Sequence, residues 1–187
     1  MTKETLEKVL KTPKVITLIN KNDFSGVYEY IDKDTHYCVT KFTQLLYNSG
    51  IDPFKYIHHL YEFYGYWVKF PFIQLTIPSK FKIIPFDSFG YSSGLTKVVI
   101  NEGVESIKSL AFESCSAKEY YLPSTLKEIQ GGAFSNKSIK VIYNGSYDDL
   151  KEICGFRKES TDHRELKSYL FESGYDTCTL ETSDLIV

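Results

Sequence analysis

Apolar residues recur in the middle of the chain in three aligned units. The thirteen residues Ile77–Phe89 align without gaps to Ile100–Phe112 and to Leu122–Phe134, at offsets of 23 and then 22 residues. Each unit has an apolar residue at its first, fifth and eighth positions, a small residue at the twelfth and Phe at the thirteenth. Repeats of about 20–29 residues are typical of chains that stack one unit on the next. The pattern therefore predicts a short solenoid.

The segment before each unit alternates apolar and polar residues, as a half-buried strand does. The apolar positions, predicted to face the core, are Phe72, Leu75, Ile77, Leu95, Val98, Ile100, Ala117, Tyr120 and Leu122. Successive strand residues face opposite sides, so the residues between them point outward. The outward residues are Gln74, Thr76, Lys97, Val99, Asn101, Glu119 and Tyr121, with Lys140, Ile142 and Asn144 continuing the row. Stacked strands place them on one face, which is either a recognition surface for a partner or a set of ordinary solvated positions.

The first sixty residues have helical rather than strand spacing. Capping residues predict helices or helical turns that begin at Thr2, Asp23, Thr35 and Asp52. Thr12-Pro13 ends the first helix, and a short apolar segment follows at 15–19. Gly50 ends the helix that begins at Thr35. Residues 61–70 follow with six aromatic side chains in ten positions. Because the end unit of a solenoid needs a cover, this run is predicted to pack the helices onto the repeats; the alternative is an exposed aromatic binding patch.

The repeat pattern decays after Phe134. Asn144-Gly145 indicates a turn, and Ser146 can cap a helix that runs through Ile153. One more amphipathic helix is predicted to begin near Thr161 or Asp162, and the last dozen residues form a strand or a tail. The fold class is therefore α+β, with a helical cap over residues 1–70, the solenoid over 71–145, and a C-terminal cap and tail over 146–187.

Composition and charge argue against a nucleic-acid-binding, a secreted or a membrane-spanning protein. The chain has 187 residues and a net charge of −2, and its sequence shows no basic cluster of the kind that nucleic-acid binding requires, although clustering in the fold could still form one. We therefore do not expect nucleic-acid binding. Residues 3–8 carry charges where a secretory peptide needs an apolar run, and no later stretch approaches a membrane span. We therefore expect a cytoplasmic protein. Its widely spaced cysteines, Cys38, Cys115, Cys154 and Cys178, are expected to be separate reduced thiols.

The candidates for catalysis are few. His36 and Cys38 are two residues apart near a predicted helix start, so their side chains are expected to point in different directions. The adjacent His58 and His59 are likewise expected to point apart on a helix. A further set combines Cys154 with Asp162 and His163, a spacing that matches no known mechanism. No glycine-rich phosphate loop is present. We therefore expect no catalytic residue, no metal site and no cofactor.

One unit carries a specific motif. It has the pattern Ile-x-x-x-Val-x-x-Ile-x-x-x-Ala-Phe-x-x-Cys, at Ile100, Val104, Ile107, Ala111, Phe112 and Cys115. This motif resembles the BspA-like class of leucine-rich repeats, over about residues 72–145. The neighbouring units depart from it at Phe81, Ser88, Ser92 and Lys137. The resemblance implies that Cys115 is a packing residue of the repeat, and that the solenoid is a non-enzymatic protein-binding module.

The segments that flank the repeats carry a second resemblance. Residues 40–42, 50–57 and 142–146 are similar to small leucine-rich-repeat proteins encoded by tailed bacteriophages. This resemblance implies a protein in the host cytoplasm that binds a host factor, to redirect it or to block a defence system. An alternative is a structural or assembly component that forms a homo-oligomer or joins a virion. If the protein is a binding module, we expect the outward strand residues to contact a protein partner. The sequence does not determine the oligomeric state.

Overall fold

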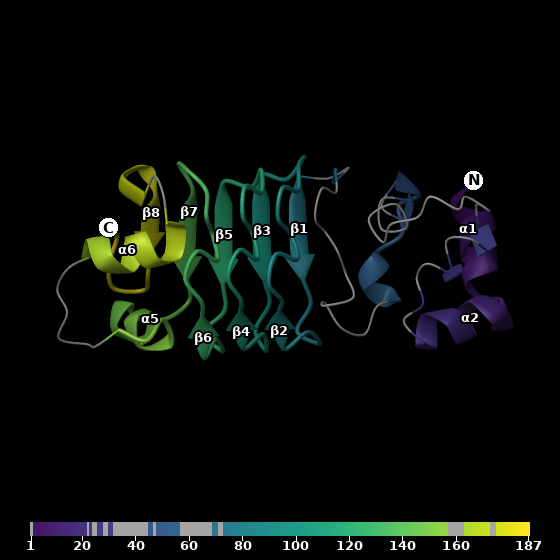
Figure 1. Ribbon diagram of the computed structural model, residues 1–187, viewed down its shortest axis with the longest axis horizontal. Helices are drawn as coiled ribbons and strands as arrows, with labels where there is room; N and C mark the ends of the chain where they lie inside the picture. Colours follow the sequence, from purple (N-terminus) through teal and green to yellow (C-terminus); the bar gives the residue numbers. More distant parts are fainter. Residues whose placement is uncertain are drawn as a thin grey trace.

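The computed structural model describes residues 2–21, 23, 26–27, 30–31, 45–46, 48–56, 69–70, 73–156, 163–172 and 175–187. Figure 1 shows helices at the N-terminal end, parallel strands in the middle, and helices again at the C-terminal end. The predicted fold class is therefore confirmed. Several predictions fall outside the described residues: those for His36, Cys38, His58, His59, Phe72, Asp162 and most of the aromatic run at 61–70.

Two of the predicted capping residues, Thr2 and Asp52, begin helices, while the start predicted at Thr35 lies outside the described residues. Helix α1 spans Lys3–Leu10, and the Thr2 side chain accepts a hydrogen bond from the backbone N–H of Thr5 at 3.3 Å. Helix α2 spans Pro13–Asn20, with Pro13 in its first turn. The 3₁₀ helix η1, Pro53–Lys55, is capped by the side chain of Asp52. Apolar residues of α1 and α2, such as Leu6, Leu10 and Val15, are buried in the same hydrophobic cluster as the residues of the solenoid.

Each repeat contributes one strand to each of two parallel sheets. The larger sheet has the order β1 (Gln74–Ile77), β3 (Lys97–Ile100), β5 (Glu119–Leu122), β7 (Lys140–Tyr143) and β8 (Thr179–Glu181). The smaller sheet has the order β2 (Ile83–Ile84), β4 (Ser106–Ile107) and β6 (Glu128–Ile129). The chain therefore advances by one strand position with every repeat (Figure 1).

The two sheets enclose a column of stacked aromatic rings. The ring centroids of Phe89 and Phe112 lie 5.4 Å apart, and those of Phe112 and Phe134 lie 5.6 Å apart, with nearly parallel planes. Tyr120 packs edge-on against Phe112 and Phe134. All four side chains are fully buried. The Phe112 backbone N–H donates to the carbonyl of Ala133 at 2.9 Å, and the small side chain at that position leaves room for this close stacking of turns.

The turn before each phenylalanine requires a left-handed backbone at the eleventh position of the repeat. Asp87, Leu110 and Gly132 occupy this position with φ values of 57°, 57° and 68°. Glycine adopts this conformation without strain, whereas in Asp87 and Leu110 the Cβ atom crowds the backbone and destabilises it. The geometry of the turn is therefore kept even where the residue does not favour it.

The helix predicted to begin near Thr161 or Asp162, and the strand that was one alternative for the last dozen residues, are both present in the C-terminal cap, as α6 (His163–Phe171) and β8. The sequence pattern did not predict that they form a fourth turn. The carbonyl of Leu170 in α6 accepts from Phe134 N–H at 3.1 Å, as Ala133 accepts from Phe112. Phe171 is fully buried, and it follows Leu170 in the chain as Phe134 follows Ala133. Strand β8 then extends the large sheet beyond β7. Helix α5, Tyr147–Ile153, starts at Ser146 with a capping box, as predicted.

Residues at both ends of the chain cover the solenoid. At the C-terminal end, Leu180 and Val187 exchange two backbone hydrogen bonds of 2.9 Å, so the last residues fold back along the outer edge of β8. At the N-terminal end, the Phe54 ring packs edge-on against Phe81 at 5.5 Å, and the Lys80 ammonium donates to the Phe54 carbonyl. The division of the chain at residues 70 and 145 stays a prediction.

We predict that Phe171→Ala destabilises the protein as strongly as Phe112→Ala, by roughly 3–5 kcal/mol, because both remove a fully buried ring from the hydrophobic core. The free energy of unfolding in urea measures the effect. Phe86→Ala is the control, since that ring is 62% exposed and its loss should cost less than about 0.5 kcal/mol. A marginal loss for Phe171→Ala would mean that α6 does not close the hydrophobic core at the C-terminal end.

We predict that Asp87→Asn stabilises the protein at about pH 7 and has little effect at about pH 3. Burial, and then the nearby Glu113 carboxylate, raise the pKa of Asp87. In the described part of the chain, its buried Oδ1 has no hydrogen-bond partner. A raised folded-state pKa means that the charged form is disfavoured in the fold, so stability falls as pH rises above the ordinary pKa of Asp, about 3.9. Asn also tolerates the left-handed backbone. An equal gain at both pH values would contradict this account.

Candidate protein-binding face

The outward residues of the large sheet form one continuous face, which we call the strand strip. It comprises the predicted residues Gln74, Thr76, Lys97, Val99, Asn101, Glu119, Tyr121, Lys140 and Ile142. The strand register aligns Gln74, Lys97, Glu119 and Lys140 in one row, and Thr76, Val99, Tyr121 and Ile142 in a second. The residues between them on the strands, such as Leu75, Val98, Tyr120 and Val141, are buried. The predicted orientation is therefore confirmed, while the binding role stays a prediction.

Tyr121 lies at the centre of the strand strip and is held from two sides. The Lys97 ammonium lies 4.1 Å from the centroid of the Tyr121 ring, within the range of a cation–π contact. The Tyr121 hydroxyl donates to the Glu119 carboxylate at 3.1 Å. These contacts hold a half-buried aromatic ring in one position before any partner arrives. Such fixed aromatic side chains are frequent anchors of protein interfaces.

The charges on the strand strip alternate, and they are balanced once Glu181 of the neighbouring strand β8 is counted. Lys97, Glu119 and Lys140 are neighbours in one row, and Lys140 forms an ion pair with Glu181 of β8. The hydrogen bond to Glu181 raises the pKa of Lys140. The row beside them contains the apolar side chains of Val99 and Ile142 around Tyr121. The face therefore has an apolar centre with a balanced polar border, rather than one dominant charge.

Strand β8 adds two residues to this face that the sequence prediction missed. Thr179 lies opposite Lys140, and Glu181 lies opposite Ile142. The strand is only three residues long and follows helix α6 rather than a repeat of ordinary length. The signal that could have found it is Phe171-Glu172-Ser173, which repeats the letters of Phe112-Glu113-Ser114.

A carboxylate at the carboxyl ends of the strands ties three turns together. Glu102 accepts hydrogen bonds from the backbone N–H groups of Ser124 and Thr125, at 3.0 and 3.2 Å, and from the Asn144 side chain at 3.0 Å. Burial alone would raise the pKa of Glu102, but these hydrogen bonds outweigh it and lower the pKa. Glu102 therefore braces the end of the strand strip that carries Asn101.

The described cysteines are packing residues. Cys115 and Cys154 are buried free thiols. Burial raises the pKa of both, and that of Cys154 to about 12, so at neutral pH its nucleophilic thiolate is nearly absent. Its predicted companion His163 instead packs its ring against Tyr147 at 4.9 Å. Within the described residues, no group of three His, Cys, Asp or Glu side chains is arranged to hold a metal ion, and no helix could cross a membrane.

The stacked turns, the parallel sheets and the outward strip define a leucine-rich-repeat solenoid. The sequence of residues 59–154, more than half of the chain, matches the BspA type leucine-rich repeat region in six copies. The chain therefore belongs to the BspA-type leucine-rich-repeat family. This match extends beyond residues 72–145 at both ends. Neither the curated proteins nor the solved structures compared with the chain gave a match. Leucine-rich repeats generally serve as protein-binding modules and are typically non-catalytic.

We predict that Glu102→Gln lowers the free energy of unfolding at about pH 7 and that the loss shrinks toward about pH 3. The folded-state pKa of Glu102 lies below its ordinary value, so its stabilisation is present above the ordinary pKa of Glu, about 4.3, and is lost as pH falls through the folded-state pKa. Urea unfolding at both pH values measures this effect. A loss that does not depend on pH would mean that the charge of Glu102 is not what stabilises the three turns.

Proposed function

We propose that this protein is a non-enzymatic binding module that holds one protein partner on the strand strip. The observation that supports it most strongly is Tyr121, whose ring is fixed by Lys97 and Glu119 at the centre of the strip. A preorganised ring loses little conformational entropy when a partner covers it, so more of the contact energy appears as affinity.

The composition of the strand strip indicates the kind of surface that fits it. Val99 and Ile142 lie on the strands to either side of Tyr121, so a partner with an apolar protrusion would cover all three. The charged row beside them offers both signs within a few residues. Binding of this kind depends on shape and apolar contact more than on net charge, so its affinity should change little with salt.

The finer proposal is that the partner is a host protein and that the module is encoded by a bacteriophage. Its support is the resemblance of residues 40–42, 50–57 and 142–146 to small leucine-rich-repeat proteins of tailed phages. In that setting, the module would act in the host cytoplasm. Binding would modulate or inhibit a host factor, such as a component of a defence system.

The experiment is capture of partners from a lysate of the cells in which the protein acts, followed by titration of the captured protein. The test variant carries Lys97→Glu and Tyr121→Ala, which reverse the charge and remove the ring of the central contact. Loss of an interface anchor costs about 2 kcal/mol or more, so we predict an affinity at least about thirtyfold lower.

The control variant makes the same two kinds of change elsewhere. Lys137 and Tyr91 are exposed and lie outside the strand strip, so Lys137→Glu with Tyr91→Ala should bind as the wild type does. Circular dichroism and urea unfolding check that both variants are folded. An unchanged affinity for the test variant, or an equal loss in the control, would move the binding site away from the strip.

A further inference from the structure

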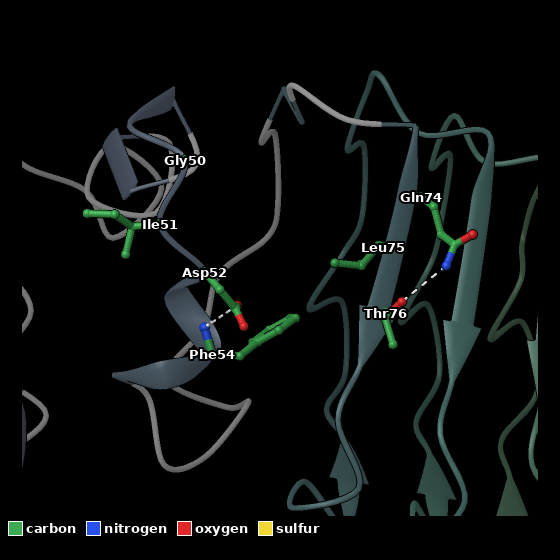
Figure 2. A pocket seen from close by; sticks show the side chains of 7 residues that line it. All are labelled: Gly50, Ile51, Asp52, Phe54, Gln74, Leu75 and Thr76. Atoms are coloured by element: carbon green, nitrogen blue, oxygen red, sulfur yellow. Dashed lines mark hydrogen bonds between the residues drawn. The ribbon is translucent and has the colours of Figure 1, made fainter. Parts of the chain in front are cut away.

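The side chain of Asn144 links turns that are far apart in the sequence. Its amide nitrogen donates to the Glu102 carboxylate at 3.0 Å, and this carboxylate also accepts from two backbone N–H groups of the turn between them. A hydrogen bond within one strand joins less. Figure 2 shows such a pair on β1, where the Gln74 amide donates to the Thr76 hydroxyl at 3.3 Å. Asn144 therefore belongs to a contact that holds three turns together.

Asn144 also has the chemically most reactive neighbour that an asparagine can have. Of the six asparagines in the sequence, only Asn144 precedes a glycine. Glycine has no side chain, so its backbone nitrogen approaches the side-chain amide of the preceding asparagine with the least obstruction. Asn144 is exposed, so water reaches its amide. The residue that links the turns is therefore also the asparagine of this chain that is most prone to deamidation.

Packing keeps glycine at position 145. A Cβ atom added there would lie 2.5 Å from Cε1 of the Tyr143 ring, and that ring is buried. Any other residue at this position would therefore have to displace a side chain of the core. The carbonyl of Gly145 accepts from Ser183 N–H at 2.9 Å, so the same residue also holds the C-terminal segment. The fold thus requires the glycine that makes Asn144 labile.

We propose that Asn144 is a site of spontaneous deamidation, and that the product releases the link that Glu102 makes between the turns. In the first step, the Gly145 backbone nitrogen attacks Cγ of Asn144. A bond forms between these two atoms and the Cγ–Nδ2 bond breaks. The proton that the Gly145 nitrogen loses leaves with Nδ2 as ammonia. Water, the one co-reactant, then opens the cyclic imide at either of its carbonyl carbons, which gives aspartate or isoaspartate.

Deamidation reverses the interaction at Glu102. The amide of Asn144 donates to the Glu102 carboxylate, whereas the carboxylate of the product cannot donate and repels it. Isoaspartate also adds a carbon atom to the backbone. The backbone is tied on both sides of this point, because Asn144 N–H donates to the Leu122 carbonyl at 3.0 Å and the Gly145 carbonyl accepts from Ser183. Both products therefore weaken the brace at the end of the strand strip.

The first test is to age the full folded chain at mildly alkaline pH in water enriched in heavy oxygen. Peptide mapping by mass spectrometry locates each residue that has exchanged NH₂ for OH, and reference peptides separate aspartate from isoaspartate. Asn101 is the internal control. It is exposed, follows β3 as Asn144 follows β7, and donates its N–H to the Ile77 carbonyl at 3.1 Å, but it precedes a glutamate. We expect conversion at Asn144 and none at Asn101 over the same period.

The second test measures what the product does to the fold. Asn144→Asp, which is one of the two products, should lower the urea midpoint at neutral pH, and the loss should shrink at acid pH, where both carboxylates are protonated. In a Glu102→Gln background the same change should cost less, because the new amide can donate to the new carboxylate. Asn144→Gln is the matched control for ageing. It keeps an amide and forms a cyclic imide far more slowly, so its urea midpoint should stay constant while that of the wild type falls.

The proposal is overturned if Asn144 takes up no more heavy oxygen than Asn101, or if the aged wild type keeps the urea midpoint of the fresh protein. If Asn144→Asp does not fold, ageing of the wild type decides, because that experiment starts from the native chain. A midpoint that falls in step with conversion of Asn144 supports the proposal. Conversion without any fall, or an equal fall in Asn144→Gln, rejects the release of the link.

Discussion

The stacking of one turn directly on the next is the constraint on which the rest of this structure depends. Parallel strands lie about 4.8 Å apart. The large buried side chains of successive turns must therefore lie almost directly above one another. The column of Phe89, Phe112 and Phe134 meets this requirement in the interior, with centroids 5.4 and 5.6 Å apart. The same stacking brings Lys97 over the ring of Tyr121, one strand along. The geometry of the candidate face is therefore a consequence of the core.

The sequence predicted the repeat because two periodicities coincide in it. The period of 22 or 23 residues gave the register of the turns, and alternation within each strand gave the side on which Val98 and Val99 lie. Capping residues such as Thr2 and Ser146 act on neighbouring N–H groups, so they could also be predicted locally. The family match over residues 59–154 agrees with this interpretation and extends it at both ends.

The features that the sequence did not predict depend on contacts between distant segments. The helix and the short strand of the C-terminal cap follow no repeat of ordinary length, so their place as a fourth turn shows only in the hydrogen bond from Phe134 to Leu170 and in the pairing of β8 with β7. From the sequence, Asp87 is an ordinary turn residue. In the structure, packing between neighbouring turns keeps its backbone left-handed and buries one of its carboxylate oxygens. In each case, neighbours from other turns decide the outcome.

The most direct test of the strand strip is photo-crosslinking in the cells where the protein acts. A benzophenone amino acid would replace Val99 on the strip and, in a second variant, Ile83, which is 50% exposed on the smaller sheet. The account predicts a discrete adduct with one other protein from position 99 and none from position 83. An adduct from position 83 with none from position 99 would contradict it.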